Sequence, residues 1–142
     1  MNQLRRRSVG FGLLLLTAAA LSGCGEDGMA VVKFREGNRN HIAQGLKIGM
    51  TEEQVHTLMA KGLPSSLSTS ELGSTPICLS NPHMSEVRII GEKRVTIRWY
   101  YTHLEKNDLL ISPEELTPIV FCQGEVLGWG KNFLPSALAG AS

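Results

Sequence analysis

The order of apolar and polar positions divides the chain into an apolar leader, a helical segment and a strand-rich second half. The leader, residues 9–20, is an apolar stretch preceded by Arg5, Arg6 and Arg7 and followed by small side chains. As a helix it would be about 18 Å long, whereas the hydrocarbon core of a bilayer is about 30 Å thick. The pattern therefore predicts a secretory signal peptide that is removed, rather than a permanent membrane span.

The clearest local signal predicts an amphipathic helix that starts at Thr51 and stops before Gly62. Thr51 and Gln54 have the spacing of a capping box, in which the hydroxyl accepts from the N3 amide and the glutamine bonds back to the cap. Gly62 favours a left-handed end. The apolar residues between them recur at helical spacing and predict one buried stripe: Val55, Leu58 and Met59.

The segment before this helix gives weaker signals. Residues 38–44 predict a short helix with Asn38 as its cap and Gly45 as its end. The small and polar residues 25–28 predict a flexible spacer. Residues 29–34 are a brief apolar run that is compatible with an edge strand or with simple packing.

The second half of the chain predicts strands. Residues 86–90 and 95–104 read as extended segments on either side of a turn at 91–94. In the second of these segments, apolar and polar side chains alternate, which predicts a strand with one buried face. On this alternation Tyr100 falls on the polar face, and it is the aromatic residue that we expect to face solvent.

A hairpin is predicted near the C-terminus. Residues 116–122 and 125–129 are short apolar runs around a turn, with Gly124 at positive φ. Pro118 cannot donate a ladder hydrogen bond, so its part of the strand should lie at an edge or face a gap in pairing. Residues 134–142 are small and weakly polar and predict a frayed tail.

Composition fits one ordinary globular domain after the leader. The chain has 142 residues, of which 42% are hydrophobic and 19% are charged. A formal net charge of +1 argues against a general nucleic-acid binder, because phosphate neutralisation requires a clustered basic excess.

The sequence contains none of the common catalytic motifs: it has no G-x-S-x-G, no P-loop, no C-x-x-C and no H-x-x-x-H. His41 has no second ligand at metal-binding spacing, so we expect a surface or capping role for it. Glu52 and Glu53 are neighbours on a helix and point about 100° apart, which makes an acid/base pair a weak interpretation. We therefore expect a protein that is not an enzyme, with no cofactor, no metal and no catalytic residue.

The residues after the leader resemble the lipobox of bacterial lipoproteins. Leu21-Ser22-Gly23-Cys24 implies that the thiol of Cys24 is acylated and that the chain is cut before it. The alternative is an ordinary signal peptide with a chance cysteine. Cleavage removes three of the 14 Lys+Arg residues and leaves 11 against 13 Asp+Glu, a net charge of −2. By resemblance to enterobacterial sorting, Gly25 implies the outer membrane.

Two further cysteines, Cys78 and Cys122, form an even pair in an oxidising compartment. A disulfide between them would close a long loop and stabilise the fold by roughly 3 to 4 kcal/mol. The alternative is a pair of half-buried thiols, because many residues would fit beside the turn at Cys122.

Three motifs together resemble the SmpA/OmlA (BamE-like) superfamily of small outer-membrane lipoproteins. They are the helix segment 45–59 with its Gly and Pro stop, the aromatic run at 99–101, and the hairpin segment 115–130. The resemblance covers about residues 38–133. It implies an α+β fold with two short helices packed on a three-stranded, possibly four-stranded, antiparallel sheet. It also implies a non-enzymatic function, such as an accessory role in outer-membrane β-barrel assembly.

The expected organisation is a signal peptide (1–23), an acylated cysteine with a tether (24–37), an α+β domain (38–133) and a flexible tail (134–142). The expected function is a lipid-anchored periplasmic protein-binding or scaffold module of the outer membrane. Its partners would be the bilayer, through acylated Cys24, and an envelope protein. The alternative is an inhibitor or immunity lipoprotein that blocks an envelope enzyme or toxin. Neither nucleic acid nor a small-molecule substrate is expected, and no partner-binding residue is assigned.

Overall fold

The computed structural model describes residues 26–69, 77–105 and 110–140, and within these ranges the fold is α+β, as predicted. Cys24 and the leader lie outside the described residues. The elements are α1 (Glu26–Gly45), α2 (Glu52–Ala60), β1 (Ser66–Thr69), β2 (Ile77–Ser80), β3 (Met84–Ile90), β4 (Lys93–Tyr101), the 3-10 turn η1 (Pro113–Glu115), β5 (Leu116–Cys122), β6 (Glu125–Trp129) and α3 (Leu134–Gly140).

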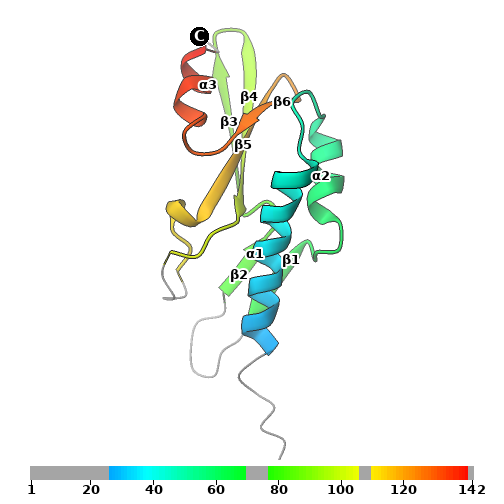
Figure 1. Cartoon of the computed structure of the whole chain (residues 1–142). Coiled ribbons are helices and arrows are strands. Elements are labelled where there is room, and N and C mark those ends of the chain that lie inside the picture. Colours follow the sequence, from blue (N-terminus) through cyan, green and yellow to red (C-terminus); the bar gives the residue numbers. More distant parts are fainter. Residues whose placement is uncertain (1–25, 70–76, 106–109, 141–142) are drawn as a thin grey trace, which may run out of the picture.

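The strands form two antiparallel sheets. The larger is a meander in the order β3-β4-β5-β6, which makes β4 and β5 its central strands, and the smaller is the β1-β2 hairpin. Figure 1 shows the hairpin beside the lower half of α1, away from the turn that joins β3 to β4. The sheet is therefore four-stranded, the larger of the two sizes expected from the sequence.

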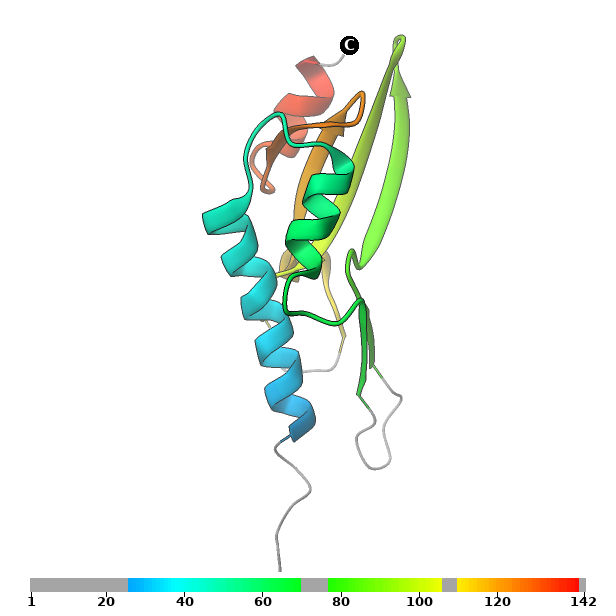
Figure 2. The same ribbon diagram turned by 90° about the vertical axis from the view of Figure 1, so that its right-hand side faces the viewer.

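Helices cover both faces of the larger sheet (Figures 1 and 2). On one face, residues of α1 and α2 share a buried cluster with Tyr100, Ile119 and Phe121. On the other face, Ala137 of α3 shares a cluster with Val95, Ile97 and Val120. Because both faces are covered, β5 is buried along nearly its whole length. The expectation of one buried face is wrong.

Tyr100 is consequently buried, with only 1% of its surface exposed, which contradicts its predicted solvent exposure. The alternation itself is correct, since Tyr100 and Tyr101 lie on opposite faces of β4. Both are nevertheless buried. Helices α1 and α2 lie over the face of Tyr100, and Tyr101 packs in a third cluster with Phe34, Leu79 and Leu116. Burial raises the pKa of the Tyr100 hydroxyl, an effect that the nearby charge of Arg98 partly opposes.

Helix α1 is longer than the sequence predicts. It begins at Glu26, so the flexible spacer is wrong for residues 26–28. Of the two alternatives for residues 29–34, the edge strand is wrong and packing is confirmed, since Val31 and Phe34 contribute to a core cluster. Asn38 is not a cap: it lies in mid-helix, fully buried, and its Nδ2 donates to the carbonyl oxygen of Tyr101 at 3.1 Å. Its Oδ1 accepts from Asn81 Nδ2 at 2.8 Å. A polar residue therefore occupies the buried stripe between Phe34 and Ile42, which hid the helical period.

The C-terminal segment is also ordered, and the predicted frayed tail is wrong for residues 134–140. They form α3, in which Ala137 is buried against the sheet. The small side chains allow the helix to lie close to β5 and β6. Its main chain is joined to the preceding turn, where Ala137 N donates to Phe133 O at 3.0 Å.

Helix α2 agrees with its prediction. Gln54 N donates to the Thr51 hydroxyl at 3.2 Å and Thr51 N donates to the Gln54 side chain at 2.9 Å, which completes the capping box. Val55 and Met59 are its buried residues. Gly62 has a φ of 70°, as expected for a left-handed helix end.

The β5-β6 hairpin also agrees. Cys122 pairs with Glu125, and Gly124 has a φ of 89°. Pro118 lies in a central strand, so it is not at an edge. Its carbonyl accepts from Gly130 N at 2.9 Å, just past the end of β6, and its nitrogen points the same way. The side of Pro118 that lacks an N–H group therefore faces the end of the β5-β6 pairing. This is the gap in pairing that the sequence offered as the alternative to an edge.

The two edges of the sheet differ. The outer edge of β6 is covered by the segment that links α1 to α2, because Gly49 N donates to Val126 O and Val126 N donates to Met50 O, both at 2.8 Å. Thr51 forms an isolated bridge with Glu125. Among the described residues, no strand pairs with the outer edge of β3.

Candidate functional site

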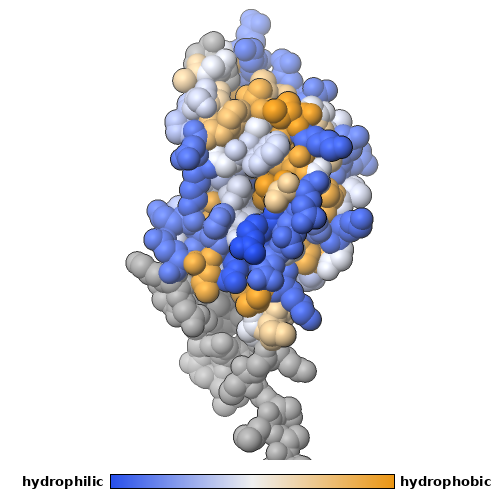
Figure 3. Space-filling model, viewed as in Figure 1, coloured by the Kyte–Doolittle hydropathy of each residue, from blue (hydrophilic) through white to orange (hydrophobic). Residues whose placement is uncertain are grey.

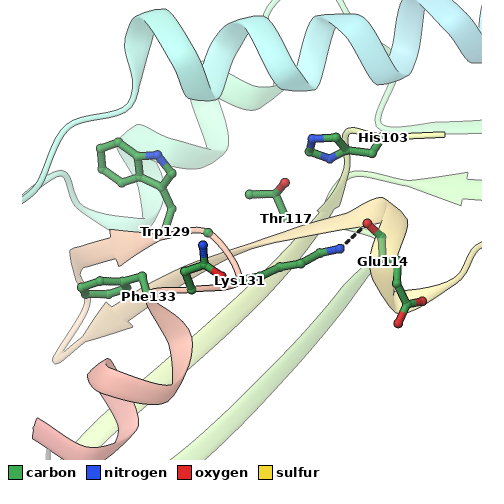
Figure 4. A pocket seen from close by; sticks show the side chains of 8 residues that line it. His103, Glu114, Thr117, Trp129, Lys131 and Phe133 are labelled. Carbon is green, nitrogen blue, oxygen red and sulfur yellow. Dashed lines mark hydrogen bonds between the residues drawn. The ribbon is translucent and has the colours of Figure 1, made fainter. Parts of the chain in front are cut away.

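A cleft of about 580 Å³ opens where β5 begins and β6 ends. Figure 4 shows two aromatic side chains at one end of it and His103 at the other, with Lys131 between them. Volumes of this order are common for small-molecule sites. The lining residues come from the end of β4, from η1, from β5 and from the turn before α3: His103, Glu114, Thr117, Trp129, Gly130, Lys131, Asn132 and Phe133.

Two glycines place the aromatic end. Gly130 has a φ of 96°, a conformation that turns the chain out of β6 toward α3. The ring of Phe133 then lies against the backbone of Gly128, where any Cβ atom would collide with it. Phe133 also packs against the cluster under α3, and Trp129 against the cluster under α1 and α2. Each aromatic residue therefore has one side in the core and another at the cleft.

The polar end is held by backbone groups. Lys131 Nζ donates to the backbone carbonyl of Glu114, and Figure 4 shows the Glu114 carboxylate turned away from this contact. The ammonium group is exposed and has no carboxylate partner among the described ion pairs, which join Arg88 to Glu86 and Arg98 to Glu52. The cleft therefore presents a cation next to aromatic surface.

A buried carboxylate shapes the wall that carries His103. Glu115 is 2% exposed and accepts from Glu105 N at 2.8 Å and from Ser112 N at 3.1 Å. Its backbone carbonyl accepts from the amide of His103 at 3.1 Å. The Glu115 side chain therefore joins two stretches of backbone, at Glu105 and at Ser112, and holds the wall of the cleft between them. Thr102 Oγ1 lies 2.7 Å from His103 Nδ1 and sets the direction of the ring.

The two glutamates considered from the sequence, Glu52 and Glu53, do not line this cleft. Glu52 is paired with Arg98 at 2.6 Å, partly buried between α2 and β4. The guanidinium of Arg98 also lies 5.3 Å from the centre of the Phe121 ring. Glu53 is exposed and lines a second, shallow cleft beside α2. The two carboxylates thus point to different environments, as expected from their spacing.

The other predicted site residues are not brought together. Cys78 in β2 and Cys122 in β5 are both free thiols in separate sheets, so the structure does not contain the disulfide considered from the sequence. His41 lies on α1, where burial and the charge of Lys61 lower its pKa. Within the described ranges, no three His, Cys, Asp or Glu side chains gather in a way that could hold a metal ion.

A family model matches part of the chain. Residues 66–135 match the model of a family described as a protein of unknown function (DUF3192). The match contains both sheets and every residue that lines the cleft, whereas α1 and α2 lie outside it. No curated protein and no solved structure matches the chain. None of the helices in the described part of the chain is long and apolar enough to span a membrane.

Sequence reasoning did not find the cleft. Lys131 and Phe133 follow the last predicted strand and carry no motif of their own. The signal that could have pointed to them is Gly128-Trp129-Gly130, since two glycines around a tryptophan suggest close packing on one side and a turn on the other. The partner ring for Gly128 could not be identified without the course of the chain after Gly130.

Proposed function

We propose that this protein is a lipid-anchored protein-binding module of the bacterial envelope. It is attached to the outer membrane through acylated Cys24, and its cleft binds an extended segment of an envelope protein. The observation that carries the proposal is that two aromatic side chains lie in an open cleft beside Lys131, whose hydrogen-bond partner in the described part of the chain is a backbone carbonyl and not a carboxylate. Aromatic residues are enriched where proteins bind one another, because their large rigid surfaces lose little conformational entropy.

The lining defines the chemistry of the bound segment. An aliphatic or aromatic side chain fits against Trp129 and Phe133, and a carboxylate a few residues away fits Lys131. This arrangement favours an acidic segment with one apolar anchor. A charge-assisted hydrogen bond to Lys131 would orient the segment, while apolar contact with the rings would supply most of the affinity.

The exposed surface over β6 also supports a protein partner. Figure 3 shows apolar side chains gathered in the upper half of the molecule, over β6 and the neighbouring helices, with hydrophilic side chains around them. Ile48 in the α1-α2 linker is 73% exposed and Leu127 in β6 is 39% exposed. An apolar centre with a polar rim is the common anatomy of a protein interface.

The position of α1 supports the anchored arrangement. The helix has 20 residues and is therefore about 30 Å long, and it begins two residues after Cys24. Figure 1 shows its first turn at the end of the molecule opposite α3 and the β3-β4 turn. A chain held by Cys24 would then carry the cleft well away from the lipid surface.

The cleft can be tested by photo-crosslinking in living cells. A benzophenone amino acid at position 132 should give a discrete adduct with one envelope protein. Lys131→Glu should reduce that adduct at least fivefold, while Lys33→Glu on the exposed side of α1 should leave it unchanged. Equal adducts in all three backgrounds, or adducts with many unrelated proteins, would contradict the proposed cleft.

The anchor is tested separately. Cys24→Ser should abolish labelling with a radioactive fatty acid and release the chain from the membrane fraction. Labelling that survives this substitution would remove the assignment of Cys24, without bearing on the cleft.

A further inference from the structure

Strand β3 has the properties of a pairing surface. It is seven residues long and lies at the margin of the sheet, where Figure 2 shows its outer side facing away from the helices. Val87 is 53% exposed and Ile89 is 69% exposed. The other edge, β6, is covered by the α1-α2 linker, and proteins usually protect free edges in such a way. Within residues 26–69, 77–105 and 110–140, the fold therefore protects one edge and leaves the other open.

The turn after β3 determines which backbone groups point outward. Gly91 and Glu92 form a two-residue loop, with Gly91 at a φ of 62°, between the paired residues Ile90 and Lys93. In such a turn the carbonyl of the first flanking residue accepts from the amide of the last, so Ile90 faces β4. Hydrogen bonding alternates along an antiparallel strand. The amides and carbonyls that point away from β4 are therefore those of Ser85, Val87 and Ile89.

The side chains of β3 are self-complementary about Val87. Glu86 and Arg88 lie on the same face of the sheet and form an ion pair at 2.5 Å, with 39% and 47% of their side chains exposed. In an antiparallel pairing of two β3 strands centred on Val87, Glu86 of each copy lies opposite Arg88 of the other. The four charges then form a ring of alternating sign, and Val87 meets Val87 on the opposite face of the sheet.

We propose that two copies of this chain associate through β3, by antiparallel pairing centred on Val87, into a continuous eight-stranded sheet. The outward amides and carbonyls of Ser85, Val87 and Ile89 are those that this register requires for hydrogen bonding. An axis at Glu86 or at Arg88 would place like charges opposite each other, which is destabilising. A twofold dimer needs one surface that complements itself, and β3 meets this condition in charge, in apolar side chains and in hydrogen-bond direction.

A second copy is favoured over an unrelated strand because the charge order of β3 complements itself in an antiparallel pair. A partner strand of another protein would need a Glu-x-Arg order, read from its own N-terminus, in the same register, which this chain already supplies. The dimer interface is distinct from the cleft, so the dimer and the cleft can each fail independently of the other.

Charge reversal tests the register. Sedimentation of the full chain in detergent should show a concentration-dependent dimer. Glu86→Arg should raise its dissociation constant about tenfold or more, because both cross-strand pairs become repulsive. The double variant Glu86→Arg/Arg88→Glu should restore the dimer, since residue 86 of one copy faces residue 88 of the other. A monomer at all concentrations, or a double variant no better than the single one, would overturn the proposal.

A cysteine placed on the axis tests the geometry in membranes. In a hydrogen-bonded antiparallel pair the two Cα atoms lie about 5.5 Å apart, which is within disulfide range. In a Cys78→Ser background, Val87→Cys should give a covalent homodimer on mild oxidation. Leu127→Cys, exposed on β6, is the matched control and should stay monomeric. Equal cross-linking of both variants, or none with Val87→Cys, would refute pairing through β3.

Discussion

The buried amide pair between α1 and the β2-β3 connection offers a quantitative test of how the N-terminal helix is held. Asn38→Ala removes the donor to the Tyr101 carbonyl and the acceptor for Asn81 Nδ2. Asn81 Nδ2 keeps its contact with the Met59 carbonyl at 3.0 Å, so the larger loss is the buried carbonyl of Tyr101. A buried polar group left without a partner costs about 1 to 3 kcal/mol, and the second lost bond adds about 1 kcal/mol.

Helix propensity acts in the opposite direction and can be measured on the same helix. Alanine is favoured over asparagine in a helix interior by about 0.6 kcal/mol. Asn40 is exposed on α1, so Asn40→Ala should stabilise the protein by about 0.5 kcal/mol. Asn38→Ala should instead destabilise it by about 1.5 to 3 kcal/mol net.

Urea unfolding of the full chain, followed by circular dichroism, measures both variants under the same conditions. The free energies of unfolding should differ by about 2 to 3.5 kcal/mol between the two alanine variants. If Asn38→Ala is as stable as Asn40→Ala, the buried amide pair does not hold α1 against the sheet and this reasoning is wrong.

Three further changes test other parts of the fold. Thr51→Ala should lower the free energy of unfolding by about 1 kcal/mol through loss of the capping box, while Thr57→Ala on the exposed side of α2 should not lower it; equal effects in urea titrations would argue against the cap. Burial lowers the pKa of His83 below its ordinary 6.5, so the unfolded chain binds that proton first as pH falls, and stability should decline from pH 6.5 downward. In His83→Gln this acid decline, measured by thermal melts at several pH values, should be smaller, and an unchanged slope would exclude His83 as its source. Ala137→Asp places a charge under α3 and should cost about 3 kcal/mol or detach the helix, as detected by hydrogen exchange of residues 134–140; Ala139→Asp, on the exposed side, should be tolerated, and equal protection in the two variants would contradict the docking of α3.

The elements with local signals were predictable from the sequence. The α2 cap depends on two side chains three residues apart, and the β5-β6 hairpin depends on a two-residue turn with Gly124. Both are determined by neighbours in the chain, so a pattern of a few residues contains the information. The α+β class follows from the same elements.

The elements that depend on distant partners were not predictable. Helix α1 contains glycines at 28 and 37 and a polar residue in its buried stripe, all of which oppose a helix when read alone. Gly37 allows Leu63 to approach, and Asn38 is satisfied by Tyr101, a residue 63 positions away. These contacts outweigh local propensity, and no short window of sequence includes them.

The same reason explains the errors at Tyr100 and in the cleft. The alternation in β4 correctly separates two faces, but which faces are buried depends on the helices. Helices α1 and α2 cover the face of Tyr100, and α3 covers the face of Val95 and Ile97. The cleft in turn depends on the turn into α3. The second buried face could not be predicted without the course of α1 and α2 over the sheet, and the candidate site could not be predicted without the turn into α3.

The backbone bridge between the α1-α2 linker and β6 also sets an order on folding. Glu52 N, in the first turn of α2, donates to the carbonyl of Gly124 at 3.0 Å, a residue more than seventy positions later in the chain. During synthesis the N-terminal half emerges first, long before that carbonyl exists. The capping box of α2 is local and needs no distant residue, but this bond between α2 and the sheet forms only after the final hairpin, and closing so long a loop is slow compared with forming a helix. Until that moment the nascent chain would have to be kept from pairing its exposed strands with other molecules.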